Sequence, residues 1–212
     1  MKNIALSSLA IFFLAVSNAA HSQTNETPSN SSFDELMQKR VSGRVYDPNK
    51  PVSKDQMKAL AEAARMAPSS YNEQPWFFIL THKNDTSEAY QKAFNSLVEF
   101  NQGWAKNAPV LVVIAAGEKS AKNNKPNRWA QYDAGAAAYS MMLKATSMGL
   151  MSHQMGGFDA DKIKQAFNLP DDITPMAVMA IGYSAENGDP AAKDRKPLKE
   201  NFFIGSWGKG IE

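Results

Sequence analysis

Residues 110–114 (VLVVI) constrain the fold of this chain more than any other segment. The run consists of β-branched and aliphatic residues without a single polar side chain. A strand with one face in water alternates apolar with polar residues, so an uninterrupted run is typical of a strand buried on both faces. The sheet that contains this strand must therefore be covered on both sides.

Strands and helices alternate along the rest of the chain. Compact apolar runs predict further strands at residues 76–81 and 176–181. Helical spacing, with N-cap candidates Ser32 and Ser53, predicts helices at 33–40, 53–66, 86–100, 133–148 and after Asp159. This interleaving predicts an α/β or α+β domain built as a three-layer sandwich.

The expected helix at residues 133–148 has no polar face. Alanine, glycine and methionine surround it almost completely, and Gly149 ends it. A helix that is apolar all round is buried on every side. In a domain this small, that pattern indicates packing against a second subunit.

The composition excludes several kinds of chemistry. The chain has 212 residues, no cysteine, three histidines and a formal net charge of +2. Without cysteine there are no disulfides and no thiolate chemistry, and the histidine spacing fits no metal motif. The scattered basic residues give no reason to expect nucleic acid as a partner. Any redox chemistry must therefore use an organic cofactor rather than a metal.

The first 22 residues resemble a signal peptide. Lys2 precedes a 13-residue apolar run, 4–16, which small residues follow. The run is too short to span a bilayer, which takes about 20 residues, so it fits an export signal better. The alternative is a buried first helix. Residues 23–32 are polar and aperiodic, as in a disordered linker, so we expect a folded domain over 33–212 in a periplasmic or secreted protein with no stable membrane span.

Three segments contain candidate binding groups. In the first, alternate residues Arg40, Ser42 and Arg44 would share one side of an extended chain, where they could bind an anion such as phosphate. Residues 67–76 (APSSYNEQPW) form a polar loop whose amides suit the edge of a heterocycle. Residues 149–158 contain Gly156 and Gly157, which let the backbone approach a ligand closely. Each segment taken alone also fits a solvated basic turn, a connector or a flexible turn.

Together these segments resemble the FMN-dependent nitroreductase family. The resemblance rests on R-x-S-x-R-x-Y, A-A-R-x-A-P-S-S-x-N-x-Q-P-W, A-P-V-L-V-V, D-A-G-A-A-A, G-L-x-x-x-x-x-G-G-F and R-K-P-L-x-E, in family order. It covers roughly residues 33–207, nearly all of the expected domain. The resemblance implies an α+β fold of three layers with a central mixed sheet, assembled as an intertwined homodimer.

The resemblance also implies roles for individual residues. Arg40 and Ser42, with Arg195 and Lys196 from the R-K-P-L segment, would bind the FMN phosphate. Arg44 would lie at the pyrimidine edge of the flavin, where a cation stabilises the charge of the reduced ring. The loop containing Ser69, Ser70 and Asn72 would reach the flavin bound mainly by the other subunit. The backbone of Gly156 and Gly157 would meet flavin N5.

These roles imply an oxidoreductase in which no side chain acts as catalyst, because the flavin performs the chemistry. By a ping-pong route, NADH, NADPH or another donor would reduce FMN, and a nitroaromatic, quinone or similar planar acceptor would reoxidise it. The donor is open, because reduced nicotinamides are scarce outside the cytoplasm. Alternatives are a reductive dehalogenase or flavin-fragmenting enzyme of the same superfamily, a non-catalytic flavin-binding or redox-sensing envelope protein, and a cofactor-free binding module.

Overall fold

A computed structural model describes residues 31–185 and 193–211. The expected signal peptide at 1–22 and nearly all of the expected linker at 23–32 lie outside these ranges. No helix in the described ranges is both long enough and apolar enough to cross a membrane.

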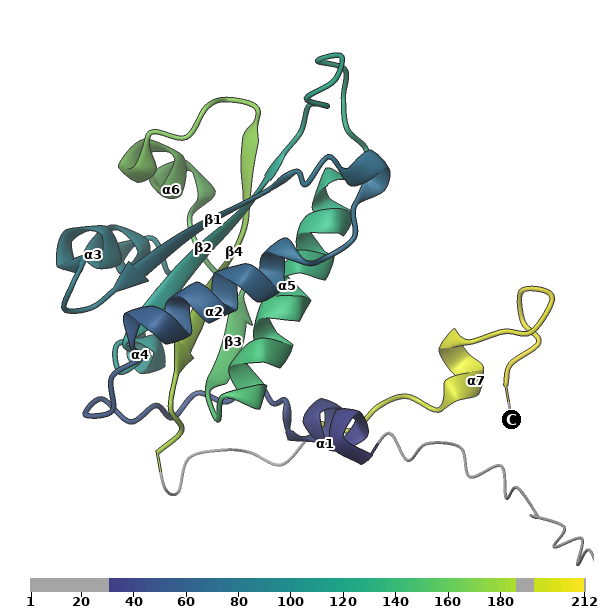
Figure 1. Cartoon of the computed structure of the whole chain (residues 1–212), viewed down its shortest axis with the longest axis horizontal. Helices are drawn as coiled ribbons and strands as arrows, with labels where there is room; N and C mark the ends of the chain where they lie inside the picture. The colour runs from purple at the N-terminus through teal and green to yellow at the C-terminus, as the bar shows by residue number, and fades with distance from the viewer. Residues whose placement is uncertain (1–30, 186–192, 212) are drawn as a thin grey trace, which may run out of the picture. The chain divides into compact units, whose positions relative to one another are not determined.

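Four strands form one sheet in the order β1-β2-β4-β3 (Figure 1). They are β1 (Trp76–His82), β2 (Val110–Gly117), β3 (Met151–Met155) and β4 (Ile173–Gly182). Every residue of β2 is buried, as its apolar run predicts. All three pairings are antiparallel. The prediction of a mixed sheet is therefore wrong for the described strands, because every neighbouring pair runs in opposite directions.

Helices cover both faces of this sheet (Figure 1). On one face, α2 (Lys54–Arg65) and α5 (Ala130–Ser147) pack against the β2 side chains Val110, Val112 and Ile114. On the other, α3 (Ser87–Asn95), α4 (Glu99–Ala105) and α6 (Ala160–Phe167) pack against Leu111 and Val113. Successive residues of a strand point to opposite faces, so the uninterrupted run of β2 supplies both cores. The three-layer α+β architecture is confirmed.

Most predicted helix ends are reproduced. The capping box of α2 is present, with Gln56 N donating to Ser53 Oγ and Ser53 N donating to Gln56 Oε1. The Asp159 side chain caps α6 by accepting from Lys162 N. Helix α1 (Ser31–Lys39) begins before Ser32, which the sequence predicts as its N-cap, so Ser32 lies inside the helix. A short helix α7 (Leu198–Asn201) follows in the tail.

Two predictions fail near α4. A single helix over 86–100 is expected, but α3 ends at Asn95 and α4 starts at Glu99. The break occurs because Leu97 pairs with Phe158 and Val98 N donates to the Gly157 carbonyl, 3.1 Å away. Residues 149–158, in which the sequence predicts no strand, contain strand β3. Its sequence MSHQM has no β-branched residue, so pairing with β4 rather than local preference makes it a strand.

Candidate functional site

Arg40, Ser42 and Arg44 lie in an irregular segment between α1 and the sheet. Arg40 Nη1 donates to Ser42 Oγ at 3.4 Å, so these two side chains are neighbours as predicted. Ser42 and Arg44 are exposed. Among the described residues, neither Arg40 nor Arg44 has a carboxylate within ion-pair distance. Two uncompensated guanidinium groups and a hydroxyl form a donor set that suits phosphate.

The structure fixes this segment to the sheet at both Gly43 and Tyr46. The Tyr46 hydroxyl donates to the carbonyl of Ala180 in β4, 3.1 Å away, and the Tyr46 ring stacks on Trp104 of α4. Nδ1 of His153 in β3 lies 3.0 Å from the carbonyl oxygen of Gly43. The polar side chains of the segment are therefore held at the β3 edge of the sheet.

His153 was not assigned a role from the sequence. The centre of its ring lies 4.7 Å from the centre of the Trp104 ring system in α4, and its Nδ1 faces Gly43. Burial lowers the pKa of His153, and the charge of Arg44 lowers it further, although the Gly43 carbonyl acts in the opposite direction. Burial thus favours the neutral form of His153, which positions residues 40–46 through its contact with Gly43. The sequence does not predict β3, so the position of His153 beside Gly43 follows only from the pairing of β3 with β4.

The glycine pair lies against the first turn of α4. The Gly157 carbonyl accepts from Val98 N at 3.1 Å and from Asn101 Nδ2 at 2.9 Å. The guanidinium carbon of Arg44 lies 5.1 Å from the centre of the ring of Phe100, on the same helix. Arg44 and Gly157, far apart in the sequence, therefore both lie against the same helix.

The two glycines differ in their surroundings. A Cβ on Gly157 would lie 2.8 Å from Asn101 Nδ2 and 2.9 Å from Val98 Cγ2, so no larger residue fits without movement. A Cβ on Gly156 would meet no atom within 4 Å. The backbone at Gly156 is open to a ligand, whereas Gly157 is required for packing.

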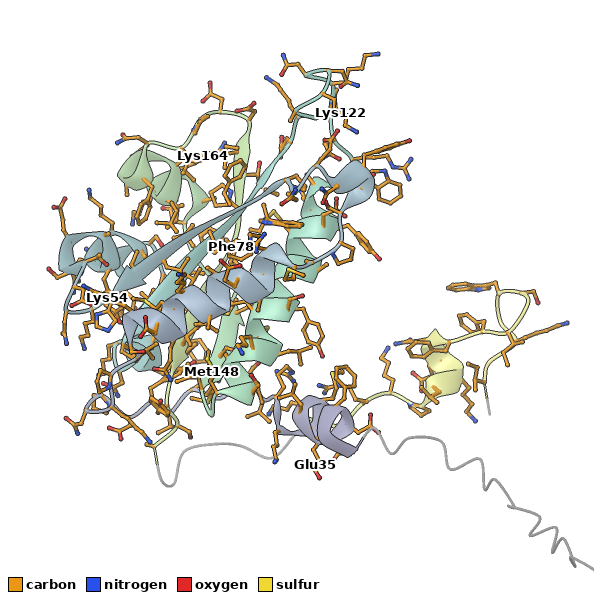
Figure 2. The ribbon with its side chains drawn as sticks, in the orientation of Figure 1. Glu35, Lys54, Phe78, Lys122, Met148 and Lys164 are labelled. Carbon is orange, nitrogen blue, oxygen red and sulfur yellow. The ribbon has the colours of Figure 1, made fainter. Side chains whose placement is uncertain are left out.

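A small cavity of about 190 Å³ lies beside the arginine segment. Lys39 and Val41 line it together with Thr146, Gly149 and Ser184. Because Thr146 belongs to the last turn of α5, this cavity places the arginine segment at the C-terminal end of that helix. Figure 2 shows the same end of α5 at Met148.

The polar loop at residues 67–76, which we call the serine loop, lies at the other end of α5. It contains the short 3-10 helix η1 (Ser70–Asn72), and Ser70 N donates to Oδ2 of the buried Asp133, 3.0 Å away. Ser69 Oγ accepts from Gln74 N at 3.0 Å. Tyr71, Asn72 and Gln74 all have positive φ angles, which side chains larger than glycine rarely adopt. Such strain is concentrated at functional sites.

The two groups of predicted ligands are therefore separated within one chain. Asp133 contacts Ser70 of the serine loop, and Thr146 lines one cavity with Val41 of the arginine segment. These two residues lie 13 positions apart in α5. This spacing corresponds to about 20 Å along the helix axis. The structure brings Arg40, Ser42, Arg44 and the glycine pair to one edge of the sheet, but it does not bring Ser69, Ser70 and Asn72 to them.

Arg195 and Lys196 make only local contacts among the residues that the structure describes. Arg195 Nη1 donates to the carbonyls of Lys193 and Asp194, and Lys196 Nζ lies 4.0 Å from Glu200 Oε2. Both side chains are exposed. Their assignment to the phosphate stays a prediction.

Comparison with known proteins gives consistent matches over most of the chain. Residues 37–183 match the sequence model of the nitroreductase family. A crystal structure described as the oxidoreductase containing FMN is 32% identical, covers 82% of this chain and 92% of its own, and has a TM-score of 0.75. A nitroreductase family protein from Clostridium difficile is 26% identical, with coverage of 81% and 97% and a TM-score of 0.67. The NADH dehydrogenase of Thermus thermophilus is 27% identical over 76% of this chain and 90% of its own.

Proposed function

Because the chain belongs to the nitroreductase family, and is thus an oxidoreductase, we propose that it uses FMN to pass electrons from a nicotinamide to planar acceptors such as nitroaromatics or quinones. The observation that carries the proposal is that Arg40, Arg44 and the open backbone at Gly156 all lie at the β3 edge of the sheet, where neither arginine has a carboxylate partner among the described residues. When bound there, FMN supplies the two-electron chemistry. The half-reactions with donor and acceptor would follow one another at the same site.

The residues at this edge suit the groups of FMN. Arg40 and Ser42 offer a guanidinium fork and a hydroxyl, which would hold the phosphate. The guanidinium carbon of Arg44 lies 5.1 Å from the centre of the Phe100 ring, and its positive charge there would stabilise the electron-rich reduced flavin ring. The open backbone at Gly156 would let the flavin approach closely. The protein would thus bind, orient and tune the cofactor.

We propose further that the site is completed by a second copy of the chain. Two observations support a homodimer. Ser70 contacts Asp133 and Val41 lies beside Thr146, and these two α5 residues are about 20 Å apart along the helix axis, which favours a flavin that takes the two groups from different subunits. The outer side of α5 exposes two aromatic side chains, with Tyr132 at 76% and Tyr139 at 38% of full exposure. A partner subunit would cover this side and bring its own loop to the site.

Mixed subunits test the shared site. Arg40→Ala removes a ligand from one group, and Asn72→Ala removes a ligand from the other. If each flavin takes Arg40 from one subunit and Asn72 from its partner, a mixture of two weak variants contains heterodimers with one intact site. Random pairing would then restore about a quarter of the wild-type activity. The two variants carry different affinity tags, so that purification on both tags in turn shows that heterodimers have formed. No recovery of activity in these heterodimers would contradict the shared site.

Stopped-flow reduction tests the function itself. The purified protein is expected to be yellow, and anaerobic mixing with NADH or NADPH is expected to bleach the flavin band near ~450 nm. Subsequent mixing with a quinone or nitroaromatic should restore the band. A bound flavin that stays oxidised with both donors would contradict the proposal.

We also propose that the protein is exported, on the basis of Lys2 and the apolar run at 4–16. Fractionation of cells that produce the full chain tests this proposal. Export predicts a shortened protein outside the cytoplasm, and a full-length cytoplasmic protein would contradict it.

A further inference from the structure

A second hollow, of about 480 Å³, lies beside the serine loop. One wall is the loop with Tyr71, and the other is the hairpin-like segment 118–129 that leads from β2 into α5. Figure 2 shows Lys122 on this segment, beyond the end of the sheet and at the opposite end of α5 from Met148. We call it the Tyr71–Trp129 hollow, after its two aromatic side chains.

Cations lie close to both aromatic rings of the hollow. Lys122 Nζ is 4.9 Å from the centre of the Tyr71 ring, and the guanidinium carbon of Arg128 is 4.4 Å from the centre of the Trp129 ring. Lys125 also lines the hollow. The rings remain accessible, with Tyr71 at 83% and Trp129 at 42% of full exposure. The hollow thus combines flat apolar surfaces with positive charge.

The positive charge is not compensated by ion pairs. Lys122, Lys125 and Arg128 have no carboxylate partner among the described residues, whereas Lys119 on the same segment pairs with Asp172. The one carboxylate lining the hollow, Glu73, is occupied as an acceptor. It accepts from Ser120 Oγ at 2.5 Å and from Asn127 Nδ2 at 3.3 Å. These bonds tie the loop to the segment and leave the three cations free for an anion.

Packing does not explain the position of Tyr71. A large aromatic side chain at a φ of +52° is a backbone outlier, and its exposed ring stabilises no core. Strain of this kind persists only where the surrounding structure holds it. Here the bonds of Glu73 to the hairpin and of Ser69 to Gln74 hold the loop and present the ring to the hollow.

We propose that the Tyr71–Trp129 hollow selects ligands in which an aromatic ring carries an anionic group. The ring would stack on Tyr71 or Trp129, and the anionic group would bind Lys122, Lys125 or Arg128. This inference rests on the proposed function, because it names the substrate class of that site. The anion is supplied either by the acceptor, as a carboxylate or sulfonate, or by the 2′-phosphate of NADPH.

A charge variant with a matched control tests the proposal. The test variant is Lys122→Gln/Arg128→Gln, and the control is Lys119→Gln, which removes a paired cation outside the hollow. The acceptor arm compares 4-nitrobenzoate with the neutral 4-nitrobenzyl alcohol, and the donor arm compares NADPH with NADH. In the arm that contains the ligand, the test variant should lose about tenfold in the kcat/KM ratio of anionic to neutral substrate. The control should keep the wild-type ratio.

A fall in the acceptor ratio identifies an anionic acceptor, and a fall in the donor ratio identifies the donor phosphate. Unchanged ratios in both arms, or an equal fall in the Lys119→Gln control, would overturn the inference.

Binding measured by calorimetry distinguishes a failure of this inference from a failure of the proposed function. 4-Nitrobenzoate, the alcohol, NADP⁺ and NAD⁺ are titrated separately into the oxidised holoprotein. None of the four is a hydride donor, so the flavin stays oxidised and only binding is measured. The wild type should bind the more anionic member of one pair more tightly, and the test variant should lose that preference. Equal affinities within both pairs would overturn the inference, even if the flavin is reduced normally. A flavin that neither NADH nor NADPH reduces would instead contradict the proposed function. The calorimetric binding preference would still support or contradict this inference, because it does not depend on flavin reduction.

Discussion

Nδ1 of His153 lies 3.0 Å from the carbonyl oxygen of Gly43, and this contact joins two segments 110 residues apart. A carbonyl oxygen only accepts, so Nδ1 carries the proton and donates it. The contact fixes the backbone between Ser42 and Arg44 against the edge strand β3. Ser42 and Arg44, two of the predicted flavin ligands, flank Gly43. Their position thus depends on a histidine that bonds the backbone between them.

The state of His153 makes stability depend on pH. Burial lowers the pKa of His153 below its usual value of 6.5, so the unfolded chain takes up a proton more readily than the folded chain. This contribution to stability is fully present above pH 6.5 and is lost as the pH falls through the folded pKa. We expect His153→Gln to reduce the fall in the free energy of unfolding between pH 7 and pH 5, measured by urea denaturation. Identical pH profiles for variant and wild type would contradict this role.

Arg40 and Arg195 are expected to bind the cofactor phosphate. A hydrogen bond to a charged group contributes about 1.5–3 kcal/mol, so each single Arg→Ala change should weaken FMN binding by about tenfold or more. The ratio of flavin to protein absorbance and the Kd for added FMN measure the effect. Arg65→Ala is the control, because Arg65 pairs with Glu62 on α2 at 2.7 Å. If Arg40→Ala weakens FMN binding and Arg195→Ala does not, Arg195 in the C-terminal tail does not bind the cofactor phosphate.

The two neighbouring glycines should respond differently to the same substitution. Gly157→Ala places a Cβ within 3 Å of Asn101 and Val98 and should lower the free energy of unfolding by about 1–3 kcal/mol. Gly156→Ala meets no atom within 4 Å and should change stability by no more than about 0.5 kcal/mol. Its methyl group should nevertheless weaken FMN binding, because the open backbone at Gly156 is proposed to face the flavin. Equal stability of the two variants would contradict the packing argument.

The positive φ of Tyr71 can be measured as an energy. A residue with a Cβ is destabilised in this conformation by about 1 kcal/mol relative to glycine. Tyr71→Gly should therefore be more stable than Tyr71→Ala by about that amount in urea denaturation. The exposed Tyr132 in α5 is the matched control, because glycine is the poorer helix residue there and the order should be reversed. The same order at both positions would argue against the strained loop.

Local chemistry accounts for the features that were predicted correctly. The run in β2 is apolar on both faces, so a strand covered on two sides was foreseeable from residues 110–114 alone. The α2 capping box and the Asp159 cap use side chains within three positions of the bonded backbone group. The proximity of Arg40 and Ser42 also follows from their spacing.

The features that the sequence alone left undetermined depend on partners distant in the chain. Strand β3 exists because β4 offers an edge, and the break before α4 exists because Phe158 and Gly157 bind Leu97 and Val98. The antiparallel order of the sheet is set by the same long-range pairing.

Neighbours along the chain were enough to predict the layers, the Ser53 cap of α2 and the motifs that resemble a flavin site. Only the tertiary structure decided where those motifs lie. It placed Arg44 and Gly157 against the same helix, α4, and it placed Ser70 beside Asp133, about 20 Å along α5 from Thr146 and the neighbouring Val41. The length of a rigid helix between two groups of ligands is a property of the folded chain, and it is the physical reason for proposing a site shared between two subunits.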